Sequence, residues 1–286
     1  VVHELDNFPS GKMCSPAASI GNKALFGAGA YANSTYYSNV DVIDDSLTLS
    51  KATDTTAVDW GAGCSSDNCA SFSGGWLKGS NAAYNMYECY TETLSRYTAY
   101  MKVGRAYHRM AAGKQYQVAV GGLNLRGSSP TSITEAADGI SGTVKQYSSV
   151  VGRMHPFVGS SGLYIIIAGG STTGSSTNEY TSSAEYIEAE TGVHGTLVDI
   201  EHPVWCGTAV SINGYVLLAG GQLSSGKYND EYGVRTINVY DPELTKRDSL
   251  QLSMGTYAMA GATTSEYAMI GGSYDHRYVE VFGFKE

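Results

Sequence analysis

Aromatic side chains are the most prominent groups with binding chemistry in this sequence, which contains 22 Tyr and 3 Trp among its 286 residues. Tyr and Trp combine a broad apolar ring with a polar tip, and beside Asn, Asp and Arg they suit contacts with glycans or protein surfaces. The residues that we expect to bind a ligand are Trp60, Trp76, Tyr107, His155, Trp205, Tyr232, Tyr257, Tyr274, Asp275 and His276.

A repeat positions these residues. Apolar runs that end in a pair of small residues, usually two glycines, recur along the chain, and the last glycines of these pairs lie 46 to 51 residues apart, at 29, 75, 122, 170, 221 and 272. A fixed period of this length is typical of a β-propeller, in which each repeat forms one four-stranded blade.

A second marker has the same period. An alternating strand follows each glycine pair, at residues 40–44, 87–91, 133–138, 184–188, 237–241 and 278–283. A shorter strand and a tight turn precede the pair, as in Ala209-Val-Ser-Ile-Asn-Gly214, where Asn-Gly is a strong hairpin signal. Two independent markers in one register predict an all-β fold.

We therefore predict a single domain, a six-bladed β-propeller that covers residues 1–286. The predicted blades are 13–54, 55–101, 102–150, 151–201, 202–253 and 254–286 plus 1–8. The last blade has no room for its own fourth strand, so we expect the N-terminal residues 1–5 to supply it. The chain begins with Val and not Met, which favours a mature or excised chain.

The charge balance excludes some classes of protein. The net charge of -9 argues against nucleic-acid binding, since phosphate recognition needs a basic surface. The longest apolar run, Leu163 to Ala168, is too short to cross a membrane.

Five cysteines do not make a disulfide framework. Cys64 and Cys69 are either a small disulfide across a hairpin or two buried thiols, and a metal site there would need two more ligands. Cys14 and Cys206 share one repeat position and are expected to be small buried residues. Asp44-Asp45 and Asn229-Asp-Glu231 offer oxygen ligands for calcium, but solvated turn acids are the favoured interpretation. We expect no cofactor and no metal.

The glycine pair and the Tyr-containing strand that follows it resemble the kelch repeat over the whole chain. Residues 19–29 and 36–48 further resemble the kelch-like repeats of tail-associated proteins of bacteriophages and prophages of gut bacteria. In a kelch propeller, the loops before the first strand and after the second strand share one face, and the aromatic residues above fall on such loops.

The resemblance implies a non-enzymatic recognition module, extracellular or virion-associated, that binds a cell-surface glycan or protein and is displayed in many copies on a phage tail or similar particle. One alternative is a secreted bacterial kelch protein that binds or isomerises carbohydrate, for which Arg105, Arg109 or Arg153 would act near Asp59 or Glu201. A sialidase would need an arginine triad and Asp-box repeats, and no such box occurs. Another alternative is a structural virion component that makes only protein contacts.

Overall fold

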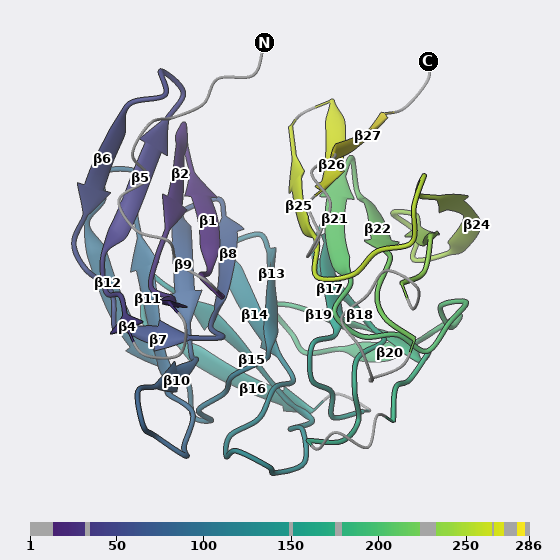
Figure 1. Cartoon of the computed structure of the whole chain (residues 1–286), viewed down its shortest axis with the longest axis horizontal. Coiled ribbons are helices and arrows are strands. Elements are labelled where there is room, and N and C mark those ends of the chain that lie inside the picture. Colours follow the sequence, from purple (N-terminus) through teal and green to yellow (C-terminus); the bar gives the residue numbers. More distant parts are fainter. Residues whose placement is uncertain are drawn as a thin grey trace.

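The computed structural model describes residues 14–31, 35–148, 151–174, 179–223, 233–264, 266–271 and 279–283. Its regular elements are β-strands, and they form successive antiparallel sheets that follow one another in chain order around a central axis. Figure 1 shows the first sheet at the upper left, the third at the bottom and the last at the upper right. The fold is an all-β, six-bladed β-propeller, as the repeat predicts.

Each of the first five sheets has four described strands, ordered from the axis to the rim. Blade 1 consists of β1 (Ala17–Ile20), β2 (Lys23–Phe26), β5 (Val40–Asp44) and β6 (Leu49–Ala52). Blade 2 consists of β8 (Ala62–Ser66), β9 (Cys69–Ser73), β11 (Met86–Tyr90) and β12 (Arg96–Tyr100). Blade 3 consists of β13 (Arg109–Gly113), β14 (Tyr116–Val120), β15 (Ile133–Asp138) and β16 (Val144–Ser148).

The second half of the chain repeats this order. Blade 4 consists of β17 (Phe157–Ser161), β18 (Tyr164–Ala168), β19 (Ala184–Glu188) and β20 (His194–Leu197). Blade 5 consists of β21 (Thr208–Ile212), β22 (Tyr215–Ala219), β23 (Thr236–Tyr240) and β24 (Lys246–Gln251). The described part of blade 6 has three strands, β25 (Ala260–Thr263), β26 (Tyr267–Gly271) and β27 (Val279–Gly283).

Local sequence explains these hairpins. The turn between β21 and β22 is Asn213-Gly214, and both residues have positive φ, which matches the twist of a two-residue hairpin. The second strands of blades 2 to 5 are buried on both faces, because each of these blades is covered by its neighbours. In β18, Ile165, Ile166 and Ile167 are fully buried, and Ile165 and Ile167 pack with Val118 and Val120 of blade 3. The core is therefore a series of layers between adjacent blades.

The last blade is the least covered. All four residues of β25 are exposed, and so are Val279 and Val281 of β27. The prediction that residues 1–5 add a fourth strand here falls on residues outside the described ranges. Among the described residues, no helix is long and apolar enough to cross a bilayer.

The disulfide differs from the predicted pair. Cys69 of β9 is bonded to Cys89 of β11, the neighbouring strand of the same blade, and Cys64 is a free buried thiol. The prediction considered only the hairpin partner, whereas the meander of blade 2 brings β11 beside β9.

Two short two-stranded sheets extend one end of the blades. β3 (Ala30–Tyr31) pairs with β4 (Thr35–Tyr36), and β7 (Val58–Asp59) pairs with β10 (Trp76–Leu77). We call this end of the propeller the loop face, and the opposite end, with the turns between the first and second strands, the turn face.

Candidate functional site

A ring of residues in the left-handed backbone region surrounds the axis at the loop face. Each ring residue stands a few positions before the first strand of a blade and has φ between 49° and 60°, and they are Cys14, Trp60, Tyr107, His155, Cys206 and Ala258. The sequence predicts five of these positions. It names Tyr257 for the sixth, but the structure places Ala258 there, and Tyr257 is buried with 2% exposure.

Backbone hydrogen bonds link the ring from blade to blade. The N–H of Tyr107 donates to the carbonyl of Trp60 at 3.2 Å, and the N–H of His155 donates to the carbonyl of Tyr107 at 2.8 Å. The N–H of Cys206 continues the chain to His155, and the N–H of Ala258 to Cys206, at 3.4 and 2.7 Å. A left-handed residue is costly for most side chains, and these bonds hold it in place.

The glycine pairs brace the ring from the neighbouring blade. The N–H of Gly122 donates to the carbonyl of Arg153 at 2.8 Å, two residues before the ring residue His155. Gly75, Gly170 and Gly221 make the equivalent bond to Arg105, Val204 and Thr256. The glycines that define the repeat therefore fix the positions of the ring side chains.

The side chains of the ring form an aromatic cluster. The ring centroid of Tyr107 lies 5.1 Å from that of Trp60 and 5.0 Å from that of His155, and Trp60 lies 5.5 Å from His155. Trp205 extends the cluster, with its centroid 5.3 Å from His155, and stacks on Tyr180 at 5.6 Å. Edge-to-face pairs at these distances favour a fixed arrangement.

A further aromatic residue supports the cluster from outside the ring. Trp76 is fully buried, with its centroid 5.9 Å from that of Tyr107. The guanidinium of Arg126 lies 4.5 Å above the Trp76 ring, in a cation–π contact. Trp60 is the most exposed member, at 36%. A ligand at the loop face would therefore contact Trp60 first. Tyr107 packs against Trp60, and Trp76 supports Tyr107 from below.

A carboxylate lies at the edge of this cluster. Asp59 precedes Trp60 and pairs with Trp76 in the two-stranded sheet of β7 and β10. The hydroxyl of Tyr36, from blade 1, donates to Oδ2 of Asp59 at 3.2 Å. Burial raises the pKa of Asp59, while the Tyr36 hydrogen bond and the charge of Arg126 lower it. Polar groups from three blades thus meet beside the exposed indole of Trp60.

Two buried histidines lie at the axis. His155 has 4% exposure, and His108 shares a hydrogen bond with the Ser73 hydroxyl at 2.8 Å. Burial lowers the pKa of both imidazoles well below 6.5, and the charge of Arg109 lowers both further. Both histidines are therefore neutral near pH 7.

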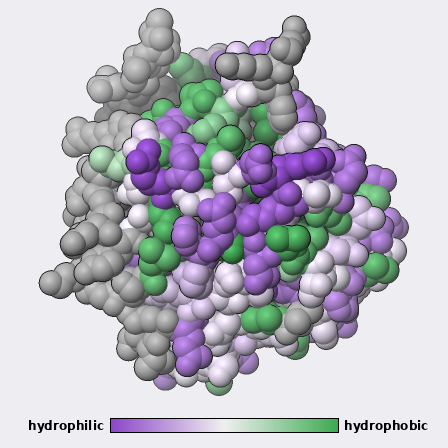
Figure 2. Space-filling view, turned by 90° about the vertical axis from the view of Figure 1, so that its right-hand side faces the viewer, coloured by the Kyte–Doolittle hydropathy of each residue, from purple (hydrophilic) through white to green (hydrophobic). Residues whose placement is uncertain are grey.

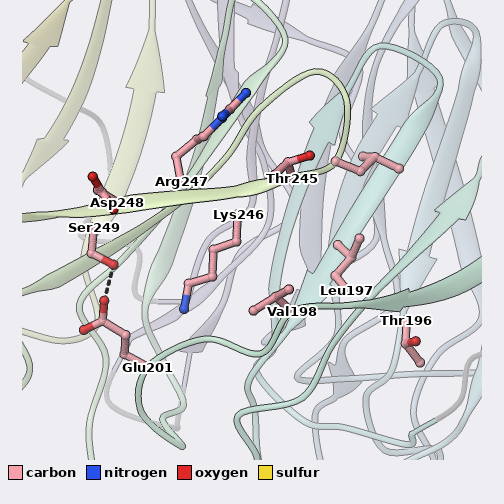
Figure 3. Close-up of a pocket in the computed structure, with 10 residues that line it drawn as sticks. Thr196, Leu197, Val198, Glu201, Thr245, Lys246, Arg247, Asp248 and Ser249 are labelled. Atoms are coloured by element: carbon pink, nitrogen blue, oxygen red, sulfur yellow. Dashed lines mark hydrogen bonds between the residues drawn. The ribbon is translucent and has the colours of Figure 1, made fainter.

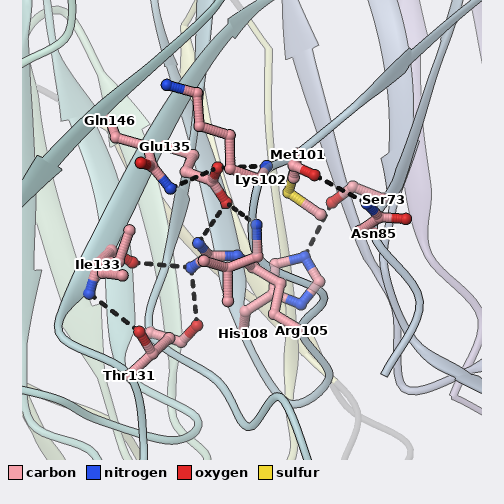
Figure 4. Close-up of polar contacts among 12 residues, drawn as sticks. Ser73, Asn85, Met101, Lys102, Arg105, His108, Thr131, Ile133, Glu135 and Gln146 are labelled. Atoms are coloured by element: carbon pink, nitrogen blue, oxygen red, sulfur yellow. Dashed lines mark hydrogen bonds and ion pairs between the residues drawn. The ribbon is translucent and has the colours of Figure 1, made fainter. Parts of the chain in front are cut away.

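The arginines of the predicted isomerase site are engaged elsewhere. Arg105 forms a buried ion pair with Glu135 at 2.6 Å and donates to the carbonyls of Gly121 and Ile133 (Figure 4). Glu135 also accepts the N–H groups of Lys102 and Val103.

Arg153 repeats this arrangement with Glu185 at 3.0 Å in blade 4. Neither arginine has an ion pair with Asp59 or Glu201 among the described residues. Both pairs join the segment before a blade to that blade's third strand, which is a structural role.

The third arginine and the other acid also differ from the expected site. Arg109 lies near the ring cysteines Cys14 and Cys206, and burial lowers the pKa of its guanidinium. Burial raises the pKa of these thiols, to about 11 for Cys14 and about 12 for Cys206. Glu201 lies at the rim and accepts the hydroxyl of Ser249. Among the described residues, Arg105, Arg109 and Arg153 thus form no ion pair with Asp59 or Glu201.

Of the residues predicted to bind a ligand, the structure brings together Trp60, Trp76, Tyr107, His155 and Trp205. Tyr257 directly precedes the ring residue Ala258 and is buried. Tyr232, Tyr274, Asp275 and His276 lie outside the described residues. Asp59 was expected only as an acid of the isomerase alternative, and neither it nor Tyr36 was among the residues predicted to bind a ligand, although both lie on the same loops as Trp60 and the first glycine pair.

Two larger cavities lie away from the aromatic cluster. A groove of about 520 Å³ at the rim lies between β20 and β24 and is lined by Leu197, Val198, Lys246 and Arg247 among others (Figure 3). Its two cations are already paired, because Lys246 donates to the carbonyl of Asp199 and Arg247 pairs with Asp241. Seen from this side, the outer surface mixes hydrophilic areas with separate hydrophobic spots (Figure 2).

The other cavity, of about 670 Å³, is the mouth of the axis at the turn face. It is lined by serines from equivalent positions of four blades, Ser19, Ser65, Ser160 and Ser211. Ser65 and Ser211 accept the backbone N–H groups of Ser19 and Ser160, so they are partnered across the blade boundaries. Within the described ranges, no group of three His, Cys, Asp or Glu residues is arranged to hold a metal ion.

Comparison with known proteins finds similarity in structure and none in sequence. No protein-family profile matches the chain, and no curated protein matches its sequence. The solved structure of YjhT is similar over 98% of this chain and 99% of that chain, with a TM-score of 0.73 and 13% sequence identity. This similarity shows the fold alone. The function is therefore argued from the loop face itself.

Proposed function

We propose that this propeller is a non-catalytic recognition module whose loop face binds a glycan on a cell surface. The observation that carries the proposal is the cluster of Trp60, Tyr107, His155 and Trp205, which is fixed by backbone bonds and presents the indole of Trp60 to solvent. Aromatic faces stack on the apolar side of a sugar ring, and neighbouring polar groups bind its hydroxyls.

The arginines support a non-catalytic function. Arg105 and Arg153, which a sugar isomerase would use, have their charges neutralised by Glu135 and Glu185 inside the blades. Opening such a pair would leave an uncompensated buried charge, at a cost of about 3–5 kcal/mol. The free thiols at the ring have raised pKa values, which makes them weak nucleophiles.

The proposal includes a place of action. We infer that the module is extracellular or virion-associated, as part of a phage tail or a similar particle that displays several copies. The Cys69–Cys89 disulfide supports an oxidising surrounding. Multivalent display would compensate for the modest affinity that a single open aromatic face provides. A protein receptor remains the second candidate ligand.

A binding screen tests the function. The purified propeller is applied to an array of bacterial surface polysaccharides and to whole bacterial cells, together with the Trp60→Ala/Trp205→Ala double variant. Saturable binding to selected glycans that the folded double variant has lost supports the proposal. Binding to cells that survives removal of the polysaccharide but not protease treatment would instead establish a protein receptor. Equal binding by the two proteins would place the site away from the loop face.

A further inference from the structure

Asp59 has a polar atom that its surroundings leave unused. The residue is only 5% exposed, and its Oδ1 is buried with no hydrogen-bond partner among the described residues. Oδ2 is occupied by the Tyr36 hydroxyl. Buried carboxylate oxygens are normally hydrogen-bonded, because an unpaired one loses its hydration without compensation. Oδ1 is therefore an acceptor for which the described protein offers no donor.

The neighbours of Asp59 indicate which kind of group could bind to Oδ1. Trp60 follows it directly, and the left-handed backbone at Trp60 (φ 56°) carries the indole to the exposed part of the face. Arg126 lies on the other side, with its Nε bonded to the carbonyl of Ser80 and its guanidinium over Trp76. The carboxylate and the guanidinium balance each other, so the pair leaves no net positive charge to attract an anion.

The whole chain points the same way. Its net charge of -9 produces a field that disfavours anionic polymers at the surface. A ligand that meets Asp59 must supply a hydrogen-bond donor and no negative charge.

We propose that Asp59 is the specificity-determining residue of the loop face, and that it selects neutral sugars by accepting a hydrogen bond from a ring hydroxyl while the sugar stacks on Trp60. This inference rests on the proposed glycan-binding function and names the class of glycan. A sugar that carries a carboxylate at the same position is rejected, since two carboxylates repel each other strongly in a poorly solvated site.

The ligand reaches Oδ1 by displacing part of its cover. The side chains that act on Asp59 are Tyr36, which is half-buried on the two-residue strand β4, and Arg126, which is exposed. Both come from loops between the second and third strands, and neither belongs to the backbone ring. The Tyr36 hydroxyl stays on Oδ2, while the exposed side chain of Arg126 can shift without disturbing the blades.

The variant that tests the proposal is Asp59→Asn. The Tyr36 hydroxyl holds the amide oxygen of the new side chain at the place of Oδ2, so its NH₂ group takes the place of Oδ1. A donor then stands where the acceptor was, with almost no change in shape. Asp67→Asn is the matched control, because Asp67 is an exposed acid at the turn face.

The probes are three matched pairs of polysaccharides immobilised on a sensor surface: galactan and polygalacturonate, mannan and polymannuronate, and glucan and polyglucuronate. We expect the natural chain to bind at least one neutral polymer at least tenfold more tightly than its uronate partner. We expect Asp59→Asn to weaken that binding about 10- to 100-fold, the value of a hydrogen bond to a charged group, and Asp67→Asn to leave it unchanged.

Each outcome decides between distinct statements. Neutral-polymer binding that Asp59→Asn leaves intact, or a preference for the uronate, overturns the role of Asp59 while the proposed function stands. Binding to none of these polymers, together with a negative surface-polysaccharide screen, overturns both. Circular dichroism in the near ultraviolet verifies that the variant is folded. If it is not, the ratio of the natural chain's affinities for the neutral polymer and its uronate partner tests the role of Asp59.

Discussion

The peptide N–H of His155 donates a hydrogen bond to the carbonyl of Tyr107 across the boundary between blades 3 and 4. The imidazole and phenol rings of these two residues lie 5.0 Å apart as a consequence. The main-chain bond therefore holds the two residues side by side whatever their side chains are, and the ring contact adds to it. Side chains on the ring can change while the blades remain in place, and this separation of binding from folding underlies the first prediction.

Replacing Trp60 by Ala is expected to weaken ligand binding about 30-fold, which is the effect of removing a hot-spot aromatic residue. The fold is expected to persist, because Trp60 is partly exposed and its backbone bond to Tyr107 does not need the indole. Binding by surface plasmon resonance and unfolding in urea measure the two effects. Tyr97→Ala, an exposed aromatic residue of β12, should change neither.

Cys206 tests the left-handed ring. Its φ is 55°, so we expect Cys206→Val to lower the free energy of unfolding by about 1–3 kcal/mol more than Cys206→Gly, since a β-branched residue is strained there and glycine is not. Cys64→Val in strand β8 is the control, where a β-branched residue is compatible with the backbone. Equal stability of the two Cys206 variants would contradict the importance of the left-handed backbone.

Gly121 tests the brace between blades. A Cβ added there would lie 2.1 Å from the carbonyl oxygen of Arg153, and the φ of 67° is unfavourable for alanine. Gly127 has a φ of 76° but nothing within 4 Å of the added atom. We expect Gly127→Ala to cost about 1 kcal/mol from the backbone alone and Gly121→Ala to cost at least about 2 kcal/mol more. Urea unfolding of both variants gives the comparison, and similar losses would refute the steric argument.

Glu135→Gln tests the buried ion pair. We expect a loss of about 3–5 kcal/mol, because the charge of Arg105 would remain buried without its partner. Arg105→Met/Glu135→Leu should lose less than Glu135→Gln, because it leaves no buried charge. As a control, Arg247→Ala removes an arginine that is 58% exposed, while Asp241 keeps the hydrogen bonds from the N–H groups of Glu243 and Thr245, so it should cost less than Glu135→Gln.

The buried histidines predict a loss of stability in acid. Their pKa values are lowered in the folded chain, so below pH 6.5 the unfolded chain binds protons that the folded chain does not. The stabilisation is complete above pH 6.5, and each histidine removes up to about 1.4 kcal/mol per pH unit as the pH falls. When the free energy of unfolding is measured in urea from pH 7 to pH 5, it should fall less steeply with pH for His155→Phe than for the natural chain. A slope that does not change would contradict the assignment.

The repeat made the architecture readable from the sequence. The strands predicted at residues 133–138 and 184–188 are β15 and β19 with the same bounds. This accuracy has a physical cause, because each blade must bury its faces against its neighbours, so the glycines and alternating strands keep one spacing. The prediction of the ring residues was wrong only at the last position. The ring residues share a backbone angle and not a residue type. Nothing in the sequence marks Ala258 as the ring residue, and the neighbouring aromatic Tyr257 fits the pattern of the other blades better.

The site was predictable in composition and not in its contacts. The sequence predicted Trp60, Trp76, Tyr107, His155 and Trp205, because the loops that carry them all lie at one end of a propeller. Pairing between distant residues was not visible. Arg105 and Arg153 looked available for a ligand, and only the fold shows that Glu135 and Glu185 neutralise them. The recurring Glu two to three residues into the third strand was the signal that could have revealed these pairs.

The ring has a consequence for how such a protein diversifies. Its positions demand a backbone angle and tolerate chemistry as different as Cys, Trp, Tyr, His and Ala. The scaffold already stabilises the left-handed backbone at these positions, so mutations there change which partner binds without changing the architecture. A library randomised at these positions, with β-branched residues and proline left out, would sample new specificities on an unchanged frame. Evolution has the same freedom, and lineages that share this propeller are expected to diverge fastest at the ring and slowest at the glycines that hold it.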